Sequence, residues 1–410
     1  MKNVYIVGAG LSGLSAAIHA VVKNFNVQLY ESSNLIGGRC RSFFDNKLGI
    51  EIDNGNHLVF SANENFYELC AIVGSVNKID ILPPDLNFFD IKENLYWNLD
   101  FRKINILKMF GETENLIPRT NLIHYLSILK FLFVNRQHTV SQIVGNSKIF
   151  KTFWDPLTLG VMNTSSNYAS AKILSNVLKK TIFKGHNYCK IYQPKENWND
   201  TIINPCINFL EKKGCDVKLK KRLKKLDVFD DFVSTLYFDD KNIKIKREDL
   251  VIMAIPPSNL KKLFPSIEVP TEYNSIVNVH FNIPKSLKKP FKKKIVGFIN
   301  TSSHWLFLKK NHMSVTISDA NSFNNFDSQE IANNIWKEIC SYMKINIPIP
   351  EFQVVKEKKA TVIQSPSNFN IVKRLTGLPK NLKISGDWTQ SELPCTIEGS
   401  ILSGKKSLIN

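Results

Sequence analysis

The chain has 410 residues and a mass of 46.9 kDa, about two to three times a common domain, so we expect one large domain or two interleaved ones. Hydrophobic residues make up 43% and charged residues 22% of it, which excludes a disordered, collagen-like or membrane-channel protein. The net charge of +18 favours an anionic partner, a nucleic acid or a membrane leaflet, although an AT-rich genome also produces such a lysine excess.

The cysteines and the apolar runs bear on compartment. Seven cysteines are scattered without a C-x-x-C pair, so we expect reduced thiols, no metal site and a cytoplasmic protein. Met1 leads almost directly into a short apolar run, which predicts no secretory signal. The longest apolar run, Leu122–Val134, is interrupted by His124 and Lys130 and is shorter than the roughly 20 residues of a spanning helix.

The first forty residues carry the strongest motif. An apolar strand, Val4–Val7, leads into G-x-G-x-x-G, a helix is predicted over 14–22, and a second strand, Val27–Tyr30, ends at an acid. This order predicts a Rossmann-like unit in which glycines let the backbone approach a pyrophosphate, the helix N-terminus offers free N–H groups, and the acid accepts hydrogen bonds from a ribose. The expected cofactor-binding residues are Gly8, Gly10, Leu11, Ser12, Gly13 and Glu31.

A second glycine pair distinguishes FAD from NAD. Gly37-Gly38-Arg39 begins six residues after Glu31, and Ser42 follows. A simple NAD domain has no need of this pair, whereas paired glycines let another backbone segment approach the cofactor and Arg39 adds a fixed cation. These residues resemble the GG-R-x-x-S/T motif of the flavin amine oxidase and phytoene desaturase superfamily. The resemblance implies that FAD is the cofactor.

A matching motif lies near the C-terminus. A predicted strand over 382–385 precedes Gly386 and Asp387, and a proline turn precedes T-I-E-G, which opens the last helix with Thr396 as its cap. In the superfamily that these residues resemble, the aspartate meets the ribityl and pyrophosphate region, and the last helix directs its N-terminus at the isoalloxazine. The resemblance implies that Gly386, Asp387, Thr396 and Ile397 bind FAD beside the N-terminal motif.

The middle of the chain suggests a discontinuous fold. Strands predicted over 217–226 and 250–255 return to the cofactor sheet, and the resemblance places a backbone group near Leu223 beside the adenine. We therefore expect an α/β protein with a Rossmann-like FAD-binding domain, discontinuous in sequence, and an α+β substrate-binding domain with a mixed sheet and helices. The first would comprise residues 1–75, 195–265 and 355–410, the second 76–194 and 266–354.

Two further motifs narrow the resemblance. Asp53-Asn54-Gly55-Asn56-His57 and W-D-P-L from Trp154, followed by N-T from Asn163, combine with the late G-D-W-T…P-x-T-I-E-G. In this order they resemble the hydroxysqualene dehydroxylases over nearly the full chain. The basic composition and Cys395, where members commonly carry a small residue, depart from the pattern. The resemblance implies protonation of the hydroxyl of hydroxysqualene, loss of water and hydride transfer from reduced FAD, giving squalene for hopanoid synthesis.

The reaction needs an acid and an apolar pocket. His57 is the first candidate acid because histidine can donate a proton near neutral pH, with a structural role in its loop as the alternative. Asp155 is the second, provided that burial raises its pKa. Aromatic faces would stabilise a cation and exclude water. The expected pocket residues are Asn56, Trp154, His280 and Trp305.

An insoluble hydrocarbon must come from a membrane or a partner enzyme. We expect Leu122–Val134, with the basic runs Lys218–Lys225 and Lys285–Lys294, to seat the protein on the anionic inner face of the membrane, and the upstream squalene-pathway synthases to be partners. No nucleic-acid-binding module is recognised, so nucleic acid is not an expected partner. The alternatives are a carotenoid or phytoene desaturase-type enzyme, an amine oxidase, and a non-catalytic isoprenoid-binding protein of the same fold.

Overall fold

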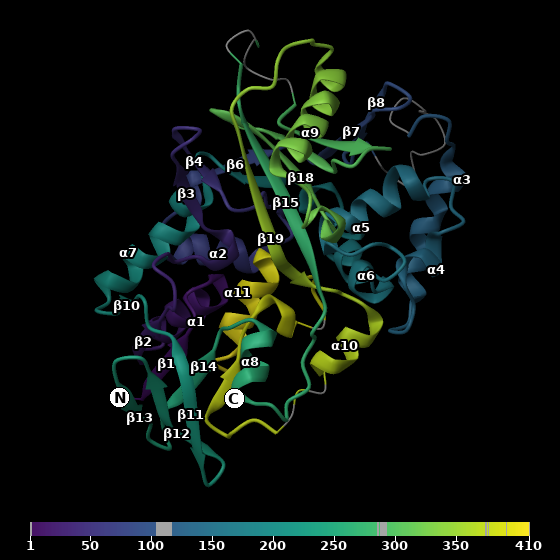
Figure 1. Ribbon diagram of the computed structural model, residues 1–410. Coiled ribbons are helices and arrows are strands. Elements are labelled where there is room, and N and C mark those ends of the chain that lie inside the picture. Colours follow the sequence, from purple (N-terminus) through teal and green to yellow (C-terminus); the bar gives the residue numbers. More distant parts are fainter. Residues whose placement is uncertain are drawn as a thin grey trace.

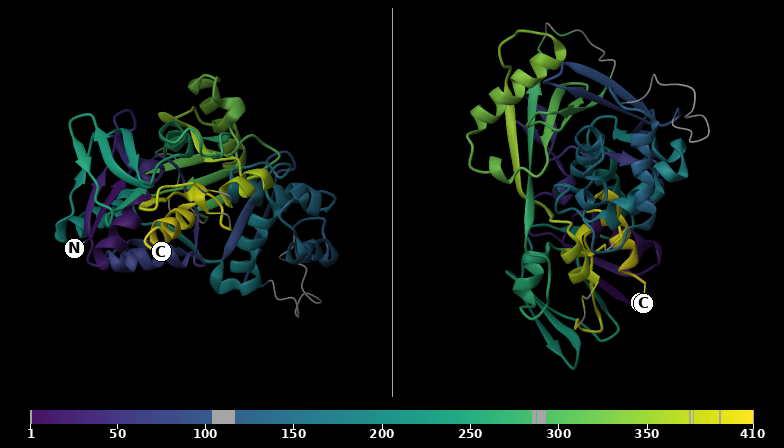
Figure 2. Two further views of the ribbon diagram at one scale, coloured as in Figure 1. Left: turned by 90° about the horizontal axis from the view of Figure 1, so that it is seen from below. Right: turned by 90° about the vertical axis from the view of Figure 1, so that its right-hand side faces the viewer.

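A computed structural model describes residues 2–103, 117–284, 287, 293–373, 375, 377–390 and 392–409. Its elements form two sheet-centred lobes, and the N- and C-termini lie at the same end of the molecule in every view (Figures 1 and 2). In the described ranges, no helix has both the length and the apolar character needed to cross a membrane.

A five-stranded parallel sheet forms the lobe that contains both termini. Val4 and Ile6 are buried on one face and Tyr5 and Val7 on the other, as expected for a parallel sheet covered on both sides. Three separate parts of the chain supply its strands, which confirms the predicted discontinuous Rossmann-like fold. Their order is β10 (Val217–Lys218), β2 (Asn26–Tyr30), β1 (Asn3–Val7), β14 (Leu250–Met253) and β20 (Leu382–Ile384).

Helices cover one face of this sheet and a small antiparallel sheet covers the other. The helical face comprises α1 (Leu11–Val22), α2 (Glu64–Ile72), α7 (Asn204–Lys212) and α11 (Ile397–Lys406). The opposite face packs against β11 (Leu223–Phe229), β12 (Phe232–Phe238), β13 (Asn242–Lys244) and α8 (Pro257–Leu263). The helix α1 lies beside α11, so the two ends of the chain share one layer (Figure 1).

The second lobe is built on a seven-stranded mixed sheet, as predicted. All its neighbours are antiparallel except β16 and β7. The helix α9 (Ser328–Met343) packs through Ile335 and Trp336 on one face. The strand order is β19 (Phe352–Val362), β15 (Tyr273–Asn282), β18 (His312–Ile317), β17 (Trp305–Leu308), β16 (Ile295–Ile299), β7 (Asp85–Asp90) and β8 (Leu95–Asp100).

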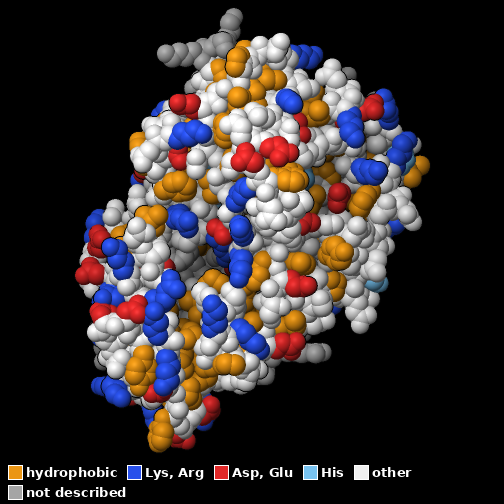
Figure 3. Space-filling model, viewed as in Figure 1, with side chains coloured by type: hydrophobic (Ala, Val, Ile, Leu, Met, Phe, Trp, Pro, Cys, Tyr) orange, Lys and Arg blue, Asp and Glu red, His pale blue; other side chains and the backbone are white. Residues whose placement is uncertain are grey.

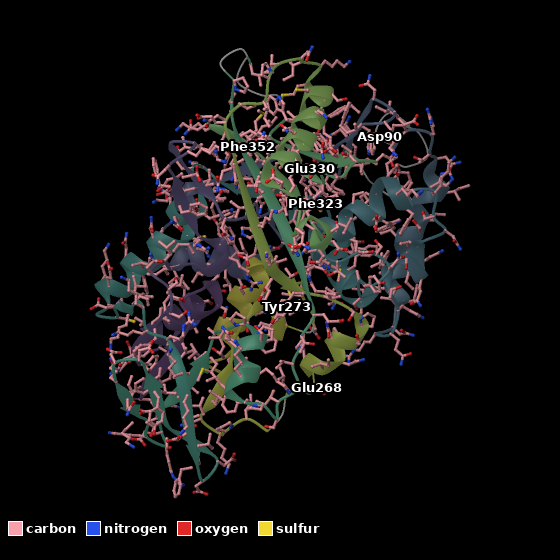
Figure 4. All side chains as sticks on the ribbon, in the orientation of Figure 1. Asp90, Glu268, Tyr273, Phe323, Glu330 and Phe352 are labelled. Carbon is pink, nitrogen blue, oxygen red and sulfur yellow. The ribbon has the colours of Figure 1, made fainter. Side chains whose placement is uncertain are left out.

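The expected domain boundary at residue 355 falls inside a strand. β19 pairs with β15 over its whole length, from Phe352 at one end to the partner of Tyr273 at the other, and Figure 4 labels these two residues. The strand therefore belongs to the seven-stranded sheet up to Val362. β19 is an edge strand, and edge strands tolerate charged side chains. The four charged residues at 356–359 therefore fit in the strand, although they gave no strand pattern in the sequence.

A helical segment packs beneath β7, β8 and β17. Its core contains Phe131, Phe153 and Trp154. The segment comprises α3 (Leu122–Tyr125), η3 (Leu126–Phe133), α4 (Val140–Val144), η4 (Phe150–Trp154), α5 (Asp155–Met162), α6 (Ala171–Lys180), η5 (Ile182–Lys184) and η6 (His186–Tyr188).

Two small sheets and several short helices complete the described fold. The first sheet is a hairpin, and the second joins segments expected in different domains. They comprise β3 (Ser42–Asp45) with β4 (Ile50–Asp53), and β5 (Val59–Phe60), β9 (Ile191–Pro194) and β6 (Ile79–Leu82). The short helices are η1 (Gly38–Cys40), η2 (Val76–Lys78), η7 (Asn199–Ile203), η8 (Asn321–Phe323), α10 (Pro366–Lys373) and η9 (Asp387–Thr389).

Candidate active site

The glycines of the N-terminal motif have two different surroundings. A Cβ on Gly8, whose φ is +104°, would lie 2.2 Å from the Ala254 carbonyl oxygen, and one on Gly13 would lie 1.9 Å from that of Gly8. These two glycines therefore allow β1, α1 and β14 to touch. Gly10 is open: the nearest atom to its Cβ position is the Gly38 Cα, 4.0 Å away. Gly10 is also the N-cap of α1, and it has no side chain to accept hydrogen bonds from the first N–H groups of the helix. A phosphate can therefore accept those hydrogen bonds.

The Gly37-Gly38 pair lies against the N-terminal glycine motif. Gly37 donates its N–H to the Ala9 carbonyl oxygen at 2.9 Å, and the Gly10 and Gly37 backbones form a parallel bridge. Arg39 then joins two further segments: one guanidinium nitrogen donates to the Asp387 carboxylate at 2.7 Å, and the other donates to the Ala360 carbonyl oxygen. The GG-R loop and the late G-D turn thus form one structure.

Both ends of the chain meet at this structure, as predicted. Ser12 and Ser385 share a hydrogen bond between hydroxyls 3.0 Å apart, and Ser15 donates to the Ile401 carbonyl oxygen at 2.8 Å. The first turn of α11 begins at Ile397, and the Thr396 hydroxyl caps it by accepting the Gly399 N–H at 3.4 Å. The N-termini of α1 and α11 therefore belong to one site.

The adenosine end of the predicted site is also assembled. One carboxylate oxygen of Glu31 accepts the Ala9 N–H and the other accepts the Ser33 N–H, both at 2.8 Å. The backbone of Lys218 and Lys221 flanks Glu31 through hydrogen bonds of 2.9 and 2.8 Å, and β11 begins just beyond, at Leu223. The open glycine cradle, the uncapped helix end and the acid at the strand end fit the pyrophosphate and ribose of FAD.

The D-N-G-x-H loop is fastened to the polar face of β15 and β18. The Asn56 amide donates to the Ser314 hydroxyl at 2.6 Å and to the Thr316 hydroxyl at 3.0 Å, and the Asn278 amide donates to the Asn54 carbonyl oxygen at 3.2 Å. The side-chain oxygen Oδ1 of Asn56 is buried without a hydrogen-bond partner among the described residues. The loop thus joins the cofactor lobe to the substrate lobe and holds one polar atom free.

Asp53, the first residue of that loop, forms a buried ion pair. Its carboxylate accepts hydrogen bonds from the Ser42 hydroxyl at 2.6 Å, the Trp198 N–H at 3.0 Å and the Lys309 ammonium. The side chains of Asp53 and Lys309 are 1% and 14% exposed. Burial alone would raise the pKa of Asp53, but the Lys309 charge and these hydrogen bonds outweigh it and lower that pKa.

Replacing Lys309 with methionine is expected to lower the free energy of unfolding by about 3–5 kcal/mol, because the Asp53 carboxylate would stay buried without its partner. Urea titration at neutral pH measures the change. The double variant Lys309→Met with Asp53→Asn should recover part of the loss. Equal stability of the single variant and the unchanged protein would show that the pair contributes nothing.

The low pKa of His57 argues against its expected role as the acid. Burial lowers that pKa to about 4, although the nearby Asp53 carboxylate opposes the change, so the ring is neutral near pH 7. Its Nε2 atom is shielded and has no hydrogen-bond partner in the described ranges, and the ring lies 5.9 Å from that of Trp198. Since a neutral imidazole holds no acidic proton, these facts favour the structural alternative for His57.

His280 is fully buried, and neither ring nitrogen has a hydrogen-bond partner in the described part of the chain. Its ring lies 5.4 Å from that of His312. Burial lowers the pKa of His280 well below its usual value. This residue therefore belongs to the interior next to Asp53 and Lys309 and is not among the described residues that line the apolar cavity.

The W-D-P-L…N-T motif has a structural role. Trp154, expected in the pocket, is fully buried in the helical segment, where its indole N–H donates to the Ser127 hydroxyl at 3.1 Å and its ring packs on Phe131. Asn163 ends α5 with a φ of +47° and accepts the Asp319 N–H at 2.7 Å. Asp155 begins α5, outside the described lining of the cavity. The motif thus fixes α5 to the sheet.

An apolar cavity lies between α5, α6 and the first turn of α11. It is partly open to solvent. Trp305 lines it, as expected, and its indole N–H has no acceptor among the described residues. Of the other lining residues, the sequence predicted Thr396 as an FAD-binding residue, and Glu398 lies in the T-I-E-G motif. Leu157, Gly160 and Val161 lie between Trp154 and Asn163, and the sequence predicted none of the other lining residues as part of a pocket. The lining includes Leu58, Phe60, Leu157, Gly160, Val161, Val177, Lys180, Leu393, Thr396 and Glu398.

The chain is similar to known proteins over almost all of its length. The sequence pattern of the family described as "Flavin containing amine oxidoreductase" matches residues 11–407. Hydroxysqualene dehydroxylase of Sinorhizobium fredii is 31% identical over 99% of this chain and 97% of its own, and that of Rhodopseudomonas palustris is 30% identical with the same shares. Cyclohexylamine oxidase from Brevibacterium oxydans has the same fold, with a TM-score of 0.72 at 12% identity over 99% of this chain and 97% of its own.

These matches do not favour the desaturase, amine oxidase or non-catalytic alternatives. They agree with the glycine cradle, the Arg39–Asp387 pair and the adjoining apolar cavity. The chain therefore belongs to the flavin containing amine oxidoreductases and, within them, to the hydroxysqualene dehydroxylases, and it is an FAD-dependent oxidoreductase.

Proposed function

We propose that this protein reduces hydroxysqualene to squalene and releases the hydroxyl as water. The apolar cavity carries the proposal, because its walls suit a long hydrocarbon and Thr396, the cap of α11, brings it next to the FAD site. One C–O bond breaks and one C–H bond forms, so each turnover consumes a hydride and a proton. Reduced FAD, when bound, supplies the hydride.

The protein's own residues would hold the cofactor and shape the reaction space. The open backbone at Gly10 and the N-terminus of α1 would hold the pyrophosphate, and Glu31 the ribose. Arg39 and Asp387 hold the loops on either side of the site together. The apolar walls exclude water that would recapture a carbocation.

The free indole N–H of Trp305 would orient the substrate. It is a buried donor on an apolar wall, and a hydroxyl oxygen of the substrate would satisfy it. This hydrogen bond would select which carbon of the substrate lies nearest to α11. The insolubility of such a substrate also implies delivery from a membrane or from the enzymes that make it, so we propose the upstream synthases as partners.

Replacing Trp305 with phenylalanine is expected to lower kcat/KM for hydroxysqualene about tenfold and to leave the FAD content unchanged, because one hydrogen bond of about 1–1.5 kcal/mol is lost. Steady-state formation of squalene measures the effect. Trp97 provides a matched control, since its indole N–H is also buried without a described partner but does not line the cavity. Equal losses in Trp305→Phe and Trp97→Phe would refute the role of Trp305.

The function itself is tested by product analysis. Purified protein, FAD and a chemical reductant are incubated with hydroxysqualene, and the extract is examined for squalene. We expect squalene with the unchanged protein and none with a protein that cannot bind FAD. Oxidation of the hydrocarbon to a more unsaturated product would instead indicate a desaturase.

A further inference from the structure

We propose that the helical run formed by α3 and η3 docks this protein on an anionic lipid bilayer. The aliphatic side chains Ile123, Leu126, Leu129 and Leu132 follow one another at intervals of three and are 40–72% exposed. Because η3 is a 3₁₀ helix with three residues per turn, Leu126, Leu129 and Leu132 lie in line along one face, and Ile123 precedes them in α3. Phe133 ends the run and is 88% exposed. We call these five residues the apolar ridge.

The opposite side of the same run is anchored in the fold. Phe131 is fully buried, its ring lies 5.0 Å from that of Trp154, and its carbonyl oxygen accepts the Ser175 hydroxyl at 2.6 Å. The Ser127 hydroxyl accepts the indole N–H of Trp154. Since these contacts hold the run in place, the apolar ridge is a surface feature that the fold presents to solvent. An exposed apolar surface of this kind marks a contact site.

The segment of the chain that contains the apolar ridge carries a strongly positive charge. Between residues 117 and 195 there are eleven Lys or Arg residues and one acid, Asp155, so more than half of the net charge of +18 lies in less than a fifth of the chain. A lysine excess that came from base composition alone would be spread more evenly. Ion pairs are described for two of these cations, Arg119 and Lys184. Lys130 and Arg136 are exposed beside the apolar ridge, and Figure 3 shows Lys and Arg beside hydrophobic side chains over α3 and α4.

A bilayer with anionic lipids matches both properties. Aliphatic side chains gain by entering the boundary between headgroups and acyl chains, and nearby cations gain from the negative potential of the leaflet. A nucleic acid would satisfy the cations but would leave the apolar ridge in contact with phosphates. The helix α6, which packs on η3, also lines the apolar cavity through Val177 and Lys180. The docked face therefore belongs to the lobe that holds the cavity.

The structure does not extend this face to the two basic runs named in the sequence. Within Lys218–Lys225, Lys221, Lys224 and Lys225 form ion pairs with Asp240, Asp239 and Asp227. These lysines lie by β10 and β11, across the molecule from α3 in both Figures 1 and 2. Most of Lys285–Lys294 lies outside the described residues. Lys218–Lys225 therefore does not extend the face formed by Leu122–Val134, because β10 and β11 lie across the molecule from α3 and acids pair with three of the run's six cations.

Vesicle sedimentation tests the docking without any substrate, so its result is independent of the proposed reaction. The full-length protein with bound FAD is mixed with vesicles of phosphatidylcholine, with or without phosphatidylglycerol. We expect binding to the mixed vesicles and little to phosphatidylcholine alone. The double variants Leu129→Ser with Phe133→Ser, and Lys130→Glu with Arg136→Glu, should each weaken binding about tenfold or more.

The controls change one exposed aromatic residue and one exposed lysine that lie away from the apolar ridge. Phe229 is 74% exposed on the β11–β12 hairpin beside Asp230 and Asp231, and Lys246 is exposed near the same hairpin. Phe229→Ser and Lys246→Glu should bind as the unchanged protein does, and retained flavin absorbance shows that each variant is folded. Equal binding by all variants would overturn the proposal. The proposal would also be overturned if the unchanged protein did not bind phosphatidylglycerol vesicles, and that result would point to an acidic protein as the partner of the apolar ridge.

Discussion

Replacing Gly10 with valine is expected to give a folded protein that purifies without FAD. The backbone at Gly10 has a φ of −72°, which valine can adopt, and the nearest atom to a Cβ there is 4.0 Å away. The fold therefore has room for the first carbon of a side chain. The valine methyl groups would occupy the space in which the backbone approaches the pyrophosphate. The visible absorbance of the purified protein, divided by its protein absorbance, measures the loss.

A contrasting glycine makes this result specific. Gly13→Ala places a Cβ 1.9 Å from the Gly8 carbonyl oxygen, a backbone atom that cannot move without separating α1 from β1. We expect this variant to be unstable or insoluble, whereas Gly10→Val keeps a normal circular dichroism spectrum and urea midpoint. Full occupancy with FAD in Gly10→Val would contradict the proposed place of the pyrophosphate.

The free energy of unfolding is expected to fall steeply between pH 6.5 and about 4. Burial, the main cause, lowers the pKa of His57 and His304 to about 4, that of His312 to about 3, and that of His280 well below 6.5. Between these pH values the histidines of the unfolded chain bind protons, whereas the same histidines in the folded chain stay neutral. The histidines therefore make their full contribution to the free energy of unfolding above pH 6.5. As the pH falls, this contribution decreases by about 1.4 kcal/mol per pH unit for each histidine.

Urea titrations at pH 7.5, 6 and 5 measure this dependence. The variant His304→Gln should reduce the slope by about one proton, because the glutamine cannot titrate and can still accept the Ser318 N–H that His304 accepts at 2.9 Å. His186, which is exposed, serves as the control, and His186→Gln should leave the slope unchanged. A free energy of unfolding that stays constant from pH 7 to pH 5 would show that these rings are accessible to protons.

The sequence predicted which segments the structure brings together at the candidate cofactor site, because the signals in those segments are local. The spacing of Gly8, Gly10 and Gly13 between a strand and a helix has one common use, and the acid at position 31 completes it. The meeting of both chain ends came from the resemblance, and the hydroxyl pair of Ser12 and Ser385 now gives it a physical basis. The identities of residues decide these features more than their surroundings do.

Features that depend on long-range packing were harder to predict. Trp154 and Trp305 are both tryptophans among apolar residues, yet one packs in the core and the other lines the cavity. The pKa of His57 depends on burial produced by segments far away in the chain. The run 122–134 was recognised as apolar from its composition. Composition does not reveal that η3 is a 3₁₀ helix, which places every third side chain of that helix on the same exposed face.

The most direct test of this account is a single-turnover experiment without oxygen. The FAD of the purified protein is reduced, excess reductant is removed, and hydroxysqualene in detergent is added while the flavin absorbance is recorded. We predict that the oxidised flavin spectrum returns and that one squalene forms for each flavin reoxidised. A flavin that stays reduced beside unconverted hydroxysqualene would contradict the account.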